Sequence, residues 1–172
     1  MKVILWMAMS TNGYIARENN SEDFISHDSW VAWLKSARNA GGVIWGRKTY
    51  EVVKTWGKGY LKDLEGIAMV VVTSDSNYQV SKYFEVVHSP RQALEKLSER
   101  GLETVLVTGG SRVNSSFAKL NLIDELVLNI EPVIVGRGIP LFAPESFDLK
   151  LEFQEMSPSE GQTIQLVYKV IK

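Results

Sequence analysis

Two apolar runs in this sequence end in glycine and continue directly into a polar, basic segment. The first is VIWGRKTYE, residues 43–51, and the second is VLVTGGSRVN, residues 105–114. Glycine loses more backbone entropy on folding than any other residue, so a strand end carries it where the chain turns sharply or where another group approaches the backbone. We therefore interpret each run as a buried strand that turns through glycine into a helix.

Apolar runs and amphipathic segments alternate along most of the remaining chain. The clearest helix starts after Ser89, because Ser89 and Gln92 form a capping box and Pro90 takes the first helical position; Gly101 closes its end. The other predicted elements are strands at 3–9, 67–74 and 83–87 and helices at 28–40 and 111–120. We also expect a long loop over the polar residues 10–28 and a long extended run over residues 124–142.

The end of the chain predicts a different arrangement. The segments LKLEFQEM and TIQLVYKVI flank a turn that contains Pro158 and Gly161, which is typical of an antiparallel hairpin. Strands that alternate with helices and then finish in a hairpin predict an α/β fold with a mixed, mostly parallel sheet covered on both faces. A chain of 172 residues suits one domain, spanning 1–172.

Neither the charge of the chain nor its opening segment suggests a macromolecular or membrane partner. The formal net charge is −1 and no basic block is present, which argues against binding to nucleic acid or an anionic membrane. The opening MKVILWMAMS is too short to cross a bilayer and lacks the cleavage pattern of a signal peptide. We expect a cytoplasmic protein that acts on a small molecule.

The residue types needed for a metal site are scarce. The chain has no cysteine, which excludes disulfides, thiolate catalysis and thiolate metal ligands. His27 and His88 are far apart in sequence, and neither is assigned a role. Glu18, Glu22 and Asp23 are spaced irregularly, so we interpret them as a solvated loop face rather than as metal ligands.

The two glycine turns have the chemistry of phosphate-binding sites. Free backbone N–H groups at the start of a helix attract phosphate oxygens, and Arg47 and Arg112 add guanidinium groups that can contact such oxygens bidentately. Either turn alone is equally well explained as an ordinary strand-to-helix connection with a solvated arginine. Two of them together suggest a ligand with several phosphates, such as a dinucleotide.

Four segments together resemble the dihydrofolate reductase-like superfamily: GRKTYE, the strand end VVVTS, the run VTGGSRVNSSF, and NLIDELVLNIEPVIVGRGIPLF. The resemblance is greatest to the branch that contains the C-terminal domain of the riboflavin-biosynthesis bifunctional deaminase-reductase. The opening MAMSTNGYIA resembles the first strand and loop of that branch, where Asp-Gly is usual and Asn12-Gly13 stands here. The resemblance covers nearly the whole chain and implies a single-domain, three-layer α/β/α fold.

The resemblance also implies that NADPH binds in an extended pose across the carboxyl edge of the sheet. Residues 46–49 would hold the adenosine-side phosphates, Thr73 and Ser74 the adenosine ribose, and residues 109–113 the pyrophosphate. In this family the Gly109–Gly110 bond is typically cis. The full implied set is Ala8, Ile15, Gly46, Arg47, Lys48, Thr49, Thr73, Ser74, Thr108, Gly109, Gly110, Ser111, Arg112 and Val113, with Ala8 and Ile15 beside the nicotinamide.

One charge near the adenosine ribose bears on the choice of cofactor. Asp75 follows Thr73 and Ser74, and an acidic group there would repel the 2′-phosphate of NADPH and suit the free ribose diol of NADH. Arg47 and Lys48 have the opposite effect. We favour NADPH because the first phosphate motif has a net positive charge.

The resemblance implies a reductase that transfers hydride to a pyrimidine ribosylamino or pteridine-type substrate, similar to 5-amino-6-(5-phosphoribosylamino)uracil reductase. Trp30 aligns with the helix position at which dihydrofolate reductases carry their acid, and indole cannot supply a proton. Glu125 and Asn129 are then the polar candidates on the substrate side, and Trp6, Trp30 and Trp33 are predicted core residues. The alternatives are dihydrofolate reduction and a non-catalytic NADPH-binding protein. Relatives in this branch are commonly homodimers.

Overall fold

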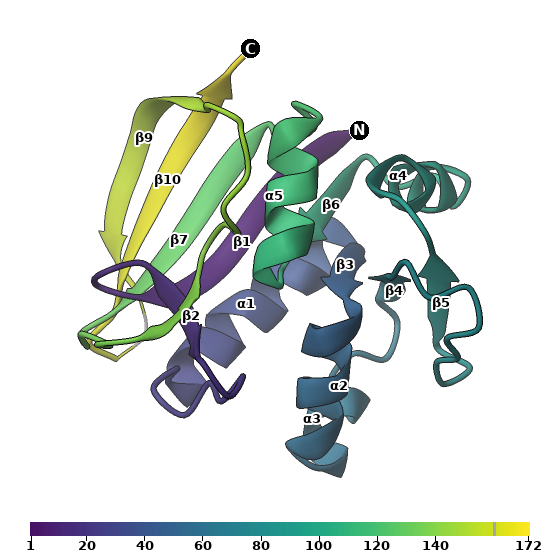
Figure 1. Ribbon diagram of the computed structural model, residues 1–172, viewed down its shortest axis with the longest axis horizontal. Helices are drawn as coiled ribbons and strands as arrows, with labels where there is room; N and C mark the ends of the chain where they lie inside the picture. Colours follow the sequence, from purple (N-terminus) through teal and green to yellow (C-terminus); the bar gives the residue numbers. More distant parts are fainter. Residues whose placement is uncertain (160) are drawn as a thin grey trace.

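The computed structural model describes residues 1–159 and 161–172, and its centre is a twisted sheet (Figure 1). The strands of this sheet are β1 (Lys2–Ser10), β3 (Gly42–Gly46), β4 (Ala68–Val72), β5 (Phe84–Val87), β6 (Thr104–Val107), β7 (Glu125–Glu131), β9 (Lys150–Pro158) and β10 (Ile164–Ile171). Their spatial order is β5-β4-β3-β6-β1-β7-β10-β9. The neighbouring strands β5, β4, β3, β6, β1 and β7 are parallel to one another. Strand β10 is antiparallel to both β7 and β9. The predicted mixed sheet with a terminal hairpin is confirmed.

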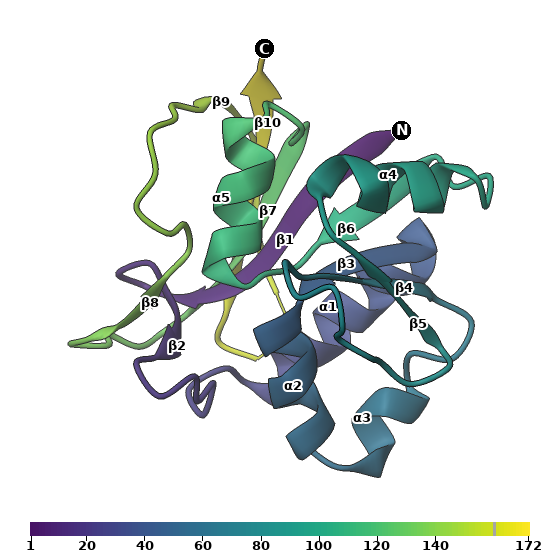
Figure 2. The ribbon, with the colours of Figure 1, turned by 45° about the vertical axis from the view of Figure 1, so that its right-hand side comes forward.

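Helices cover both faces of the sheet (Figure 2). The helices are α1 (His27–Ala40), α2 (Arg47–Thr55), α3 (Lys58–Lys62), α4 (Pro90–Ser98) and α5 (Ser111–Lys119). Side chains of α1 and α2 join one buried cluster, and side chains of α4 and α5 join another. Successive side chains of β3 point to opposite faces of the sheet, so Val43 and Trp45 belong to the first cluster and Ile44 to the second. No helix within the described residues is long and apolar enough to cross a membrane.

The helix boundaries follow from local hydrogen bonds that the sequence largely predicts. The hydroxyl of Ser89 accepts a hydrogen bond from the N–H of Gln92, as the capping box requires. The side chain of Gln92 differs from the prediction, because it accepts from the N–H of His88 rather than from that of Ser89. Helix α1 is capped in the same way by Ser26, and it ends where Gly41 adopts a φ of 78°.

A small second sheet departs from the sequence interpretation. Strand β2 (Tyr14–Arg17) lies in what we expected to be a long loop, and it pairs with β8 (Gly138–Pro140), which interrupts the expected extended run after β7. A Cβ atom at Gly138 would lie 2.4 Å from the carbonyl oxygen of Ala16, so only glycine allows this pairing. The hydrophobic pattern of the sequence does not reveal these two strands, because each is short and pairs with a segment far away in the sequence.

Candidate functional site

A cleft of about 1590 Å³ lies where the carboxyl ends of the parallel strands meet the starts of α2 and α5. Its remaining walls come from β2, β8, α1 and the segment that joins β2 to α1. The predicted site residues that line this cleft are Ala8, Ile15, Trp30, Gly46, Arg47, Lys48, Thr49, Thr73, Ser74, Thr108, Gly110, Ser111, Arg112 and Val113. One surface thus collects residues from segments that are far apart in sequence.

The two glycine turns contact each other at the base of the cleft. The N–H of Gly46 donates to the carbonyl oxygen of Gly109 at 2.6 Å, and the Gly109–Gly110 peptide bond is cis. A Cβ atom at Gly46 would lie 2.9 Å from Cγ2 of Val113 and 3.3 Å from the nitrogen of Gly110. Gly109 has a φ of 88°, and a Cβ atom there would lie 3.2 Å from Cε of Met7. Both turns therefore need glycine for the packing of the protein itself.

Free polar groups surround these turns. The N-caps of α2 and α5 are Gly46 and Gly110, and neither helix start has a side-chain cap. The hydroxyls of Thr108 and Ser111 are buried and have no hydrogen-bond partner among the described residues. Unpaired buried hydroxyls and first-turn N–H groups are suited to the phosphate and ribose oxygens of a nucleotide. The residues present therefore fit the dinucleotide that the sequence resemblance implies.

Charge is balanced differently at the two helix starts. At α2, Nη1 of Arg47 lies 3.6 Å from Oδ2 of Asp75, and Nε lies 3.7 Å from Oε1 of Glu51. The same guanidinium lies 5.6 Å from the centroid of the Tyr78 ring. At α5, Arg112 is exposed and has no ion-pair partner within the described part of the chain. Asp75 thus offsets the charge of Arg47, while the cationic charge at α5 is free.

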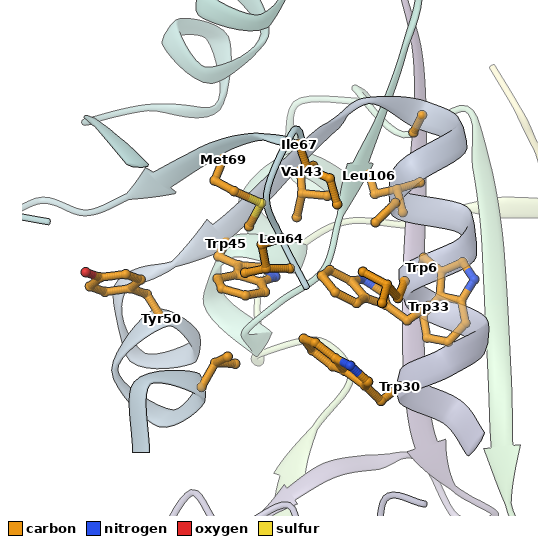
Figure 3. Packing of buried hydrophobic residues seen from close by; sticks show 14 of the residues in the cluster. Trp6, Trp30, Trp33, Val43, Trp45, Tyr50, Leu64, Ile67, Met69 and Leu106 are labelled. Atoms are coloured by element: carbon orange, nitrogen blue, oxygen red, sulfur yellow. The ribbon is translucent and has the colours of Figure 1, made fainter. Parts of the chain in front are cut away.

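Aromatic side chains form the wall at the other end of the cleft. The Trp30 ring lies 4.7 Å from that of Trp33 and 4.9 Å from that of Tyr60, and Trp56 lies 5.7 Å away on another side. Figure 3 shows Trp6, Trp30 and Trp33 in the buried cluster beneath α1. These three residues are core, as the sequence indicates, yet they also line the cleft. Such a wall suits a flat ring.

The two polar residues expected on the substrate side do not line the cleft. Glu125 begins β7, so it lies at the amino edge of the parallel sheet, opposite Ile4, where Nζ of Lys2 pairs with it at 2.7 Å. Asn129 is fully buried, and its Nδ2 donates to the hydroxyl of Ser29 at 2.7 Å. The alternation and direction of β7 therefore keep both residues away from the site.

Sequence reasoning missed Glu131, the last residue of β7. Its carboxylate is 2% exposed and accepts hydrogen bonds from the N–H and hydroxyl of Ser26, both at 2.9 Å, and from the hydroxyl of Ser29 at 2.5 Å. Ser26 is the N-cap of α1, so Glu131 fixes the start of the helix that carries Trp30. No sequence signal links Glu131 to this helix, because the residues are about a hundred positions apart.

The acidic loop after β2 is only partly the solvated face that we expected. Asp23 is exposed and pairs with Arg17 at 2.6 Å. Glu22, by contrast, is half-buried and lines the cleft, and burial raises its pKa to about 7. Among the described residues, no group of three or more His, Asp or Glu side chains could hold a metal ion.

Both histidines also line the cleft, although no sequence motif places them there. His27 is the first residue of α1 and faces Tyr60, with ring centroids 6.4 Å apart. His88 lies at the other end, where Nδ1 is 2.9 Å from the carbonyl oxygen of Thr73.

Comparison with known proteins gives a consistent family and fold. The family model for the RibD C-terminal domain matches residues 1–164. An uncharacterized protein of Bacillus subtilis (strain 168), YwjB, is 28% identical over 170 residues, which is 97% of each chain.

Two solved structures show the same fold at low sequence identity. One is the diaminohydroxyphosphoribosylaminopyrimidine deaminase/5-amino-6-(5-phosphoribosylamino)uracil reductase of Thermotoga maritima, with a TM-score of 0.73 and 20% identity over 99% of this chain and 56% of that chain. The other is the dihydrofolate reductase of Enterococcus faecalis complexed with NADP(H), with a TM-score of 0.77 and 16% identity over 99% of this chain and 97% of that one. The predicted dihydrofolate reductase-like fold is confirmed.

Proposed function

Because the chain belongs to the RibD C-terminal domain family, we propose that it is an NADPH-dependent reductase of a pyrimidine ribosylamino or pteridine-type substrate. The family and the fold support an oxidoreductase of the riboflavin-pathway type. The observation that carries the proposal is the meeting of both glycine turns, with unpaired buried hydroxyls beside them, in one cleft that ends in an aromatic wall.

In this proposal, the cofactor lies along the cleft from α2 to the aromatic wall. The first-turn N–H groups of α2 and α5, with Arg47 and Arg112, bind phosphate oxygens. Thr73 and Ser74 contact the adenosine ribose, and Ala8 and Ile15 bound the nicotinamide. When bound, NADPH supplies a hydride.

The aromatic wall binds the substrate in this proposal. Trp30, Trp56 and Tyr60 form apolar surfaces against which a flat substrate ring can stack, and this fixes the ring and excludes water from it. Their positions are set by packing within the core, so little side-chain entropy is lost when a substrate binds.

The proposal is tested by steady-state oxidation of NADPH with a panel of acceptors. The panel contains 5-amino-6-(5-phosphoribosylamino)uracil, its unphosphorylated form, reducible pterins and dihydrofolate. Turnover with a pyrimidine or pterin supports the proposal, and turnover with dihydrofolate alone favours dihydrofolate reductase activity. Tight NADPH binding without any turnover favours a non-catalytic binding protein. Absence of NADPH binding in a thermal-shift assay overturns all three, since a ligand at 100 times its Kd adds about 2.7 kcal/mol of stability.

We expect the Asp75→Asn variant to raise the preference for NADPH over NADH about fivefold, corresponding to ~1 kcal/mol. The variant removes a negative charge beside the proposed 2′-phosphate position and frees Arg47, which lies 3.6 Å from the Asp75 carboxylate. The ratio of the two dissociation constants, measured by titration calorimetry, checks this. Asp148→Asn, an exposed aspartate outside the cleft, is the matched control. An unchanged ratio in Asp75→Asn would show that Asp75 does not lie near the adenosine end of the bound cofactor.

We also propose that the protein forms a homodimer through its terminal hairpin. Strand β9 is an edge of the sheet (Figure 1), and Phe153 and Met156 on it are 58% and 64% exposed. An apolar edge strand is prone to pair with a second chain. We expect Phe153→Glu to convert the dimer to a monomer in light-scattering measurements, whereas Tyr83→Glu, at an exposed aromatic residue outside the hairpin, should not. A wild-type monomer would contradict the proposal.

A further inference from the structure

The segment between β2 and α1 holds one acidic side chain against the cleft. Arg17 contacts both residues that flank Glu22 in the sequence. The backbone N–H of Arg17 donates to the carbonyl oxygen of Ser21 at 2.8 Å, and Nε of Arg17 pairs with the carboxylate of Asp23 at 2.6 Å. The carbonyl oxygen of Glu22 accepts from the N–H of Ile25 at 2.9 Å. The backbone on each side of Glu22 is thus fixed, and its half-buried side chain belongs to the cleft wall.

Glu22 differs from the other carboxylates of this wall. Within the described residues, the cleft is lined by Glu22, Asp23 and Glu51. Asp23 is neutralised by Arg17, and Glu51 lies 3.7 Å from Nε of Arg47. Glu22 has no cationic partner in the described part of the chain, and burial raises its pKa to about 7. Near neutral pH the side chain is therefore available in its protonated form.

Other titratable groups line the cleft from the neighbouring elements. They are Asp23 from the same segment, His27 from α1, Tyr60 from α3 and Lys48 from α2, and Arg17 of β2 pairs with Asp23. Burial, rather than any of these groups, is the cause of the raised pKa of Glu22. Among these groups, His27 is the histidine, a residue type that often acts as a general acid in enzymes.

We infer that Glu22 is the general acid of the reduction, an inference that rests on the proposed function. A reduced C=N bond gains a hydride at carbon and a proton at nitrogen. The hydride comes from NADPH, and the proton comes from the carboxyl group of Glu22 as the C=N double bond becomes a single bond. The Glu22 carboxylate then regains a proton from water, so atoms and charge balance over one turnover.

The acidic residue of α1, Asp28, does not line the cleft. Trp30, which the sequence resemblance aligns with the acidic position of dihydrofolate reductases, donates its indole N–H to Oδ2 of Asp63 at 3.4 Å. The chain instead brings its acid to the same cleft from the preceding segment, with Trp30 available as a stacking surface.

Kinetics of Glu22→Gln test the role directly. Glutamine keeps the shape but cannot donate a carboxyl proton, so we expect kcat to fall about 100-fold, while KM changes far less. Wild-type kcat should decline as pH rises through about 7, and this decline should vanish in the variant. Glu18→Gln, an exposed glutamate of the same segment outside the cleft, is the matched control. If His27→Gln, and not Glu22→Gln, abolishes the pH dependence, the assignment is overturned.

A second measurement does not depend on turnover. The folded-state pKa of Glu22 is raised from 4.5 to about 7, so between these values the native state binds a proton that the unfolded state has lost. The unfolding free energy of the wild type should therefore fall, relative to that of Glu22→Gln, as pH rises through this window. Glu18→Gln should follow the wild type. Equal pH dependence in wild type and Glu22→Gln would overturn the inference, whereas a wild type that oxidises no NADPH would overturn the proposed function.

Discussion

Replacing Gly109 with valine should weaken NADPH binding about 100-fold, or about 2.7 kcal/mol, and abolish NADPH oxidation. Gly109 has a φ of 88°, a conformation that a β-branched residue adopts only at a cost of about 1–2 kcal/mol. The new Cβ atom would also lie 3.2 Å from Cε of Met7. Relief of the backbone strain at this residue moves the carbonyl oxygen that accepts the hydrogen bond of Gly46, so we expect both turns of the proposed phosphate site to be displaced together.

The dissociation constant for NADPH, measured by titration calorimetry, checks this expectation, with circular dichroism to show that the variant is folded. Gly136→Ala is the matched control, because a Cβ atom there meets nothing within 4 Å. It should bind NADPH as the wild type does. A folded Gly109→Val variant with unchanged affinity would show that the cofactor does not depend on this turn.

The second large effect concerns stability. We expect Glu131→Ala to lower the free energy of unfolding by about 3 kcal/mol, because it removes a buried, charged acceptor of three hydrogen bonds. Its partners, the N–H and hydroxyl of Ser26 and the hydroxyl of Ser29, would remain near the start of α1 without their acceptor. The loss of negative charge at this helix terminus adds to the effect.

Urea denaturation followed by tryptophan fluorescence measures this difference. Glu125→Ala is a matched control in the same strand, since Glu125 only pairs with Lys2 near the surface and should cost less than about 1 kcal/mol. Equal losses in the two variants would contradict the role given to Glu131. Because α1 carries His27 and Trp30, Glu131→Ala should also impair any activity of the cleft.

The parts of the fold that could be predicted are those that local chemistry specifies. The strand that ends at Gly46 and the capped helix after Ser89 were recognisable because hydrophobic periodicity and capping residues act over a few positions. The β2 and β8 strands were not predicted, because each is short and its pairing depends on contacts more than a hundred residues away. Glu125 was a poor choice for the substrate side for a related reason: its sequence context does not reveal which edge of the sheet it occupies.

The amino-acid sequence alone is enough to show that strands turn through glycine into helices at two places, and that the chain has no cysteine and no basic block. These features follow from residue type and local spacing. Folding in three dimensions is needed to bring the N–H of Gly46 to the carbonyl oxygen of Gly109, to place Glu131 at the start of α1, and to hold the half-buried side chain of Glu22 in the cleft wall. Each of these depends on strand order and on the direction of a side chain from a folded backbone, which residues near in sequence do not determine.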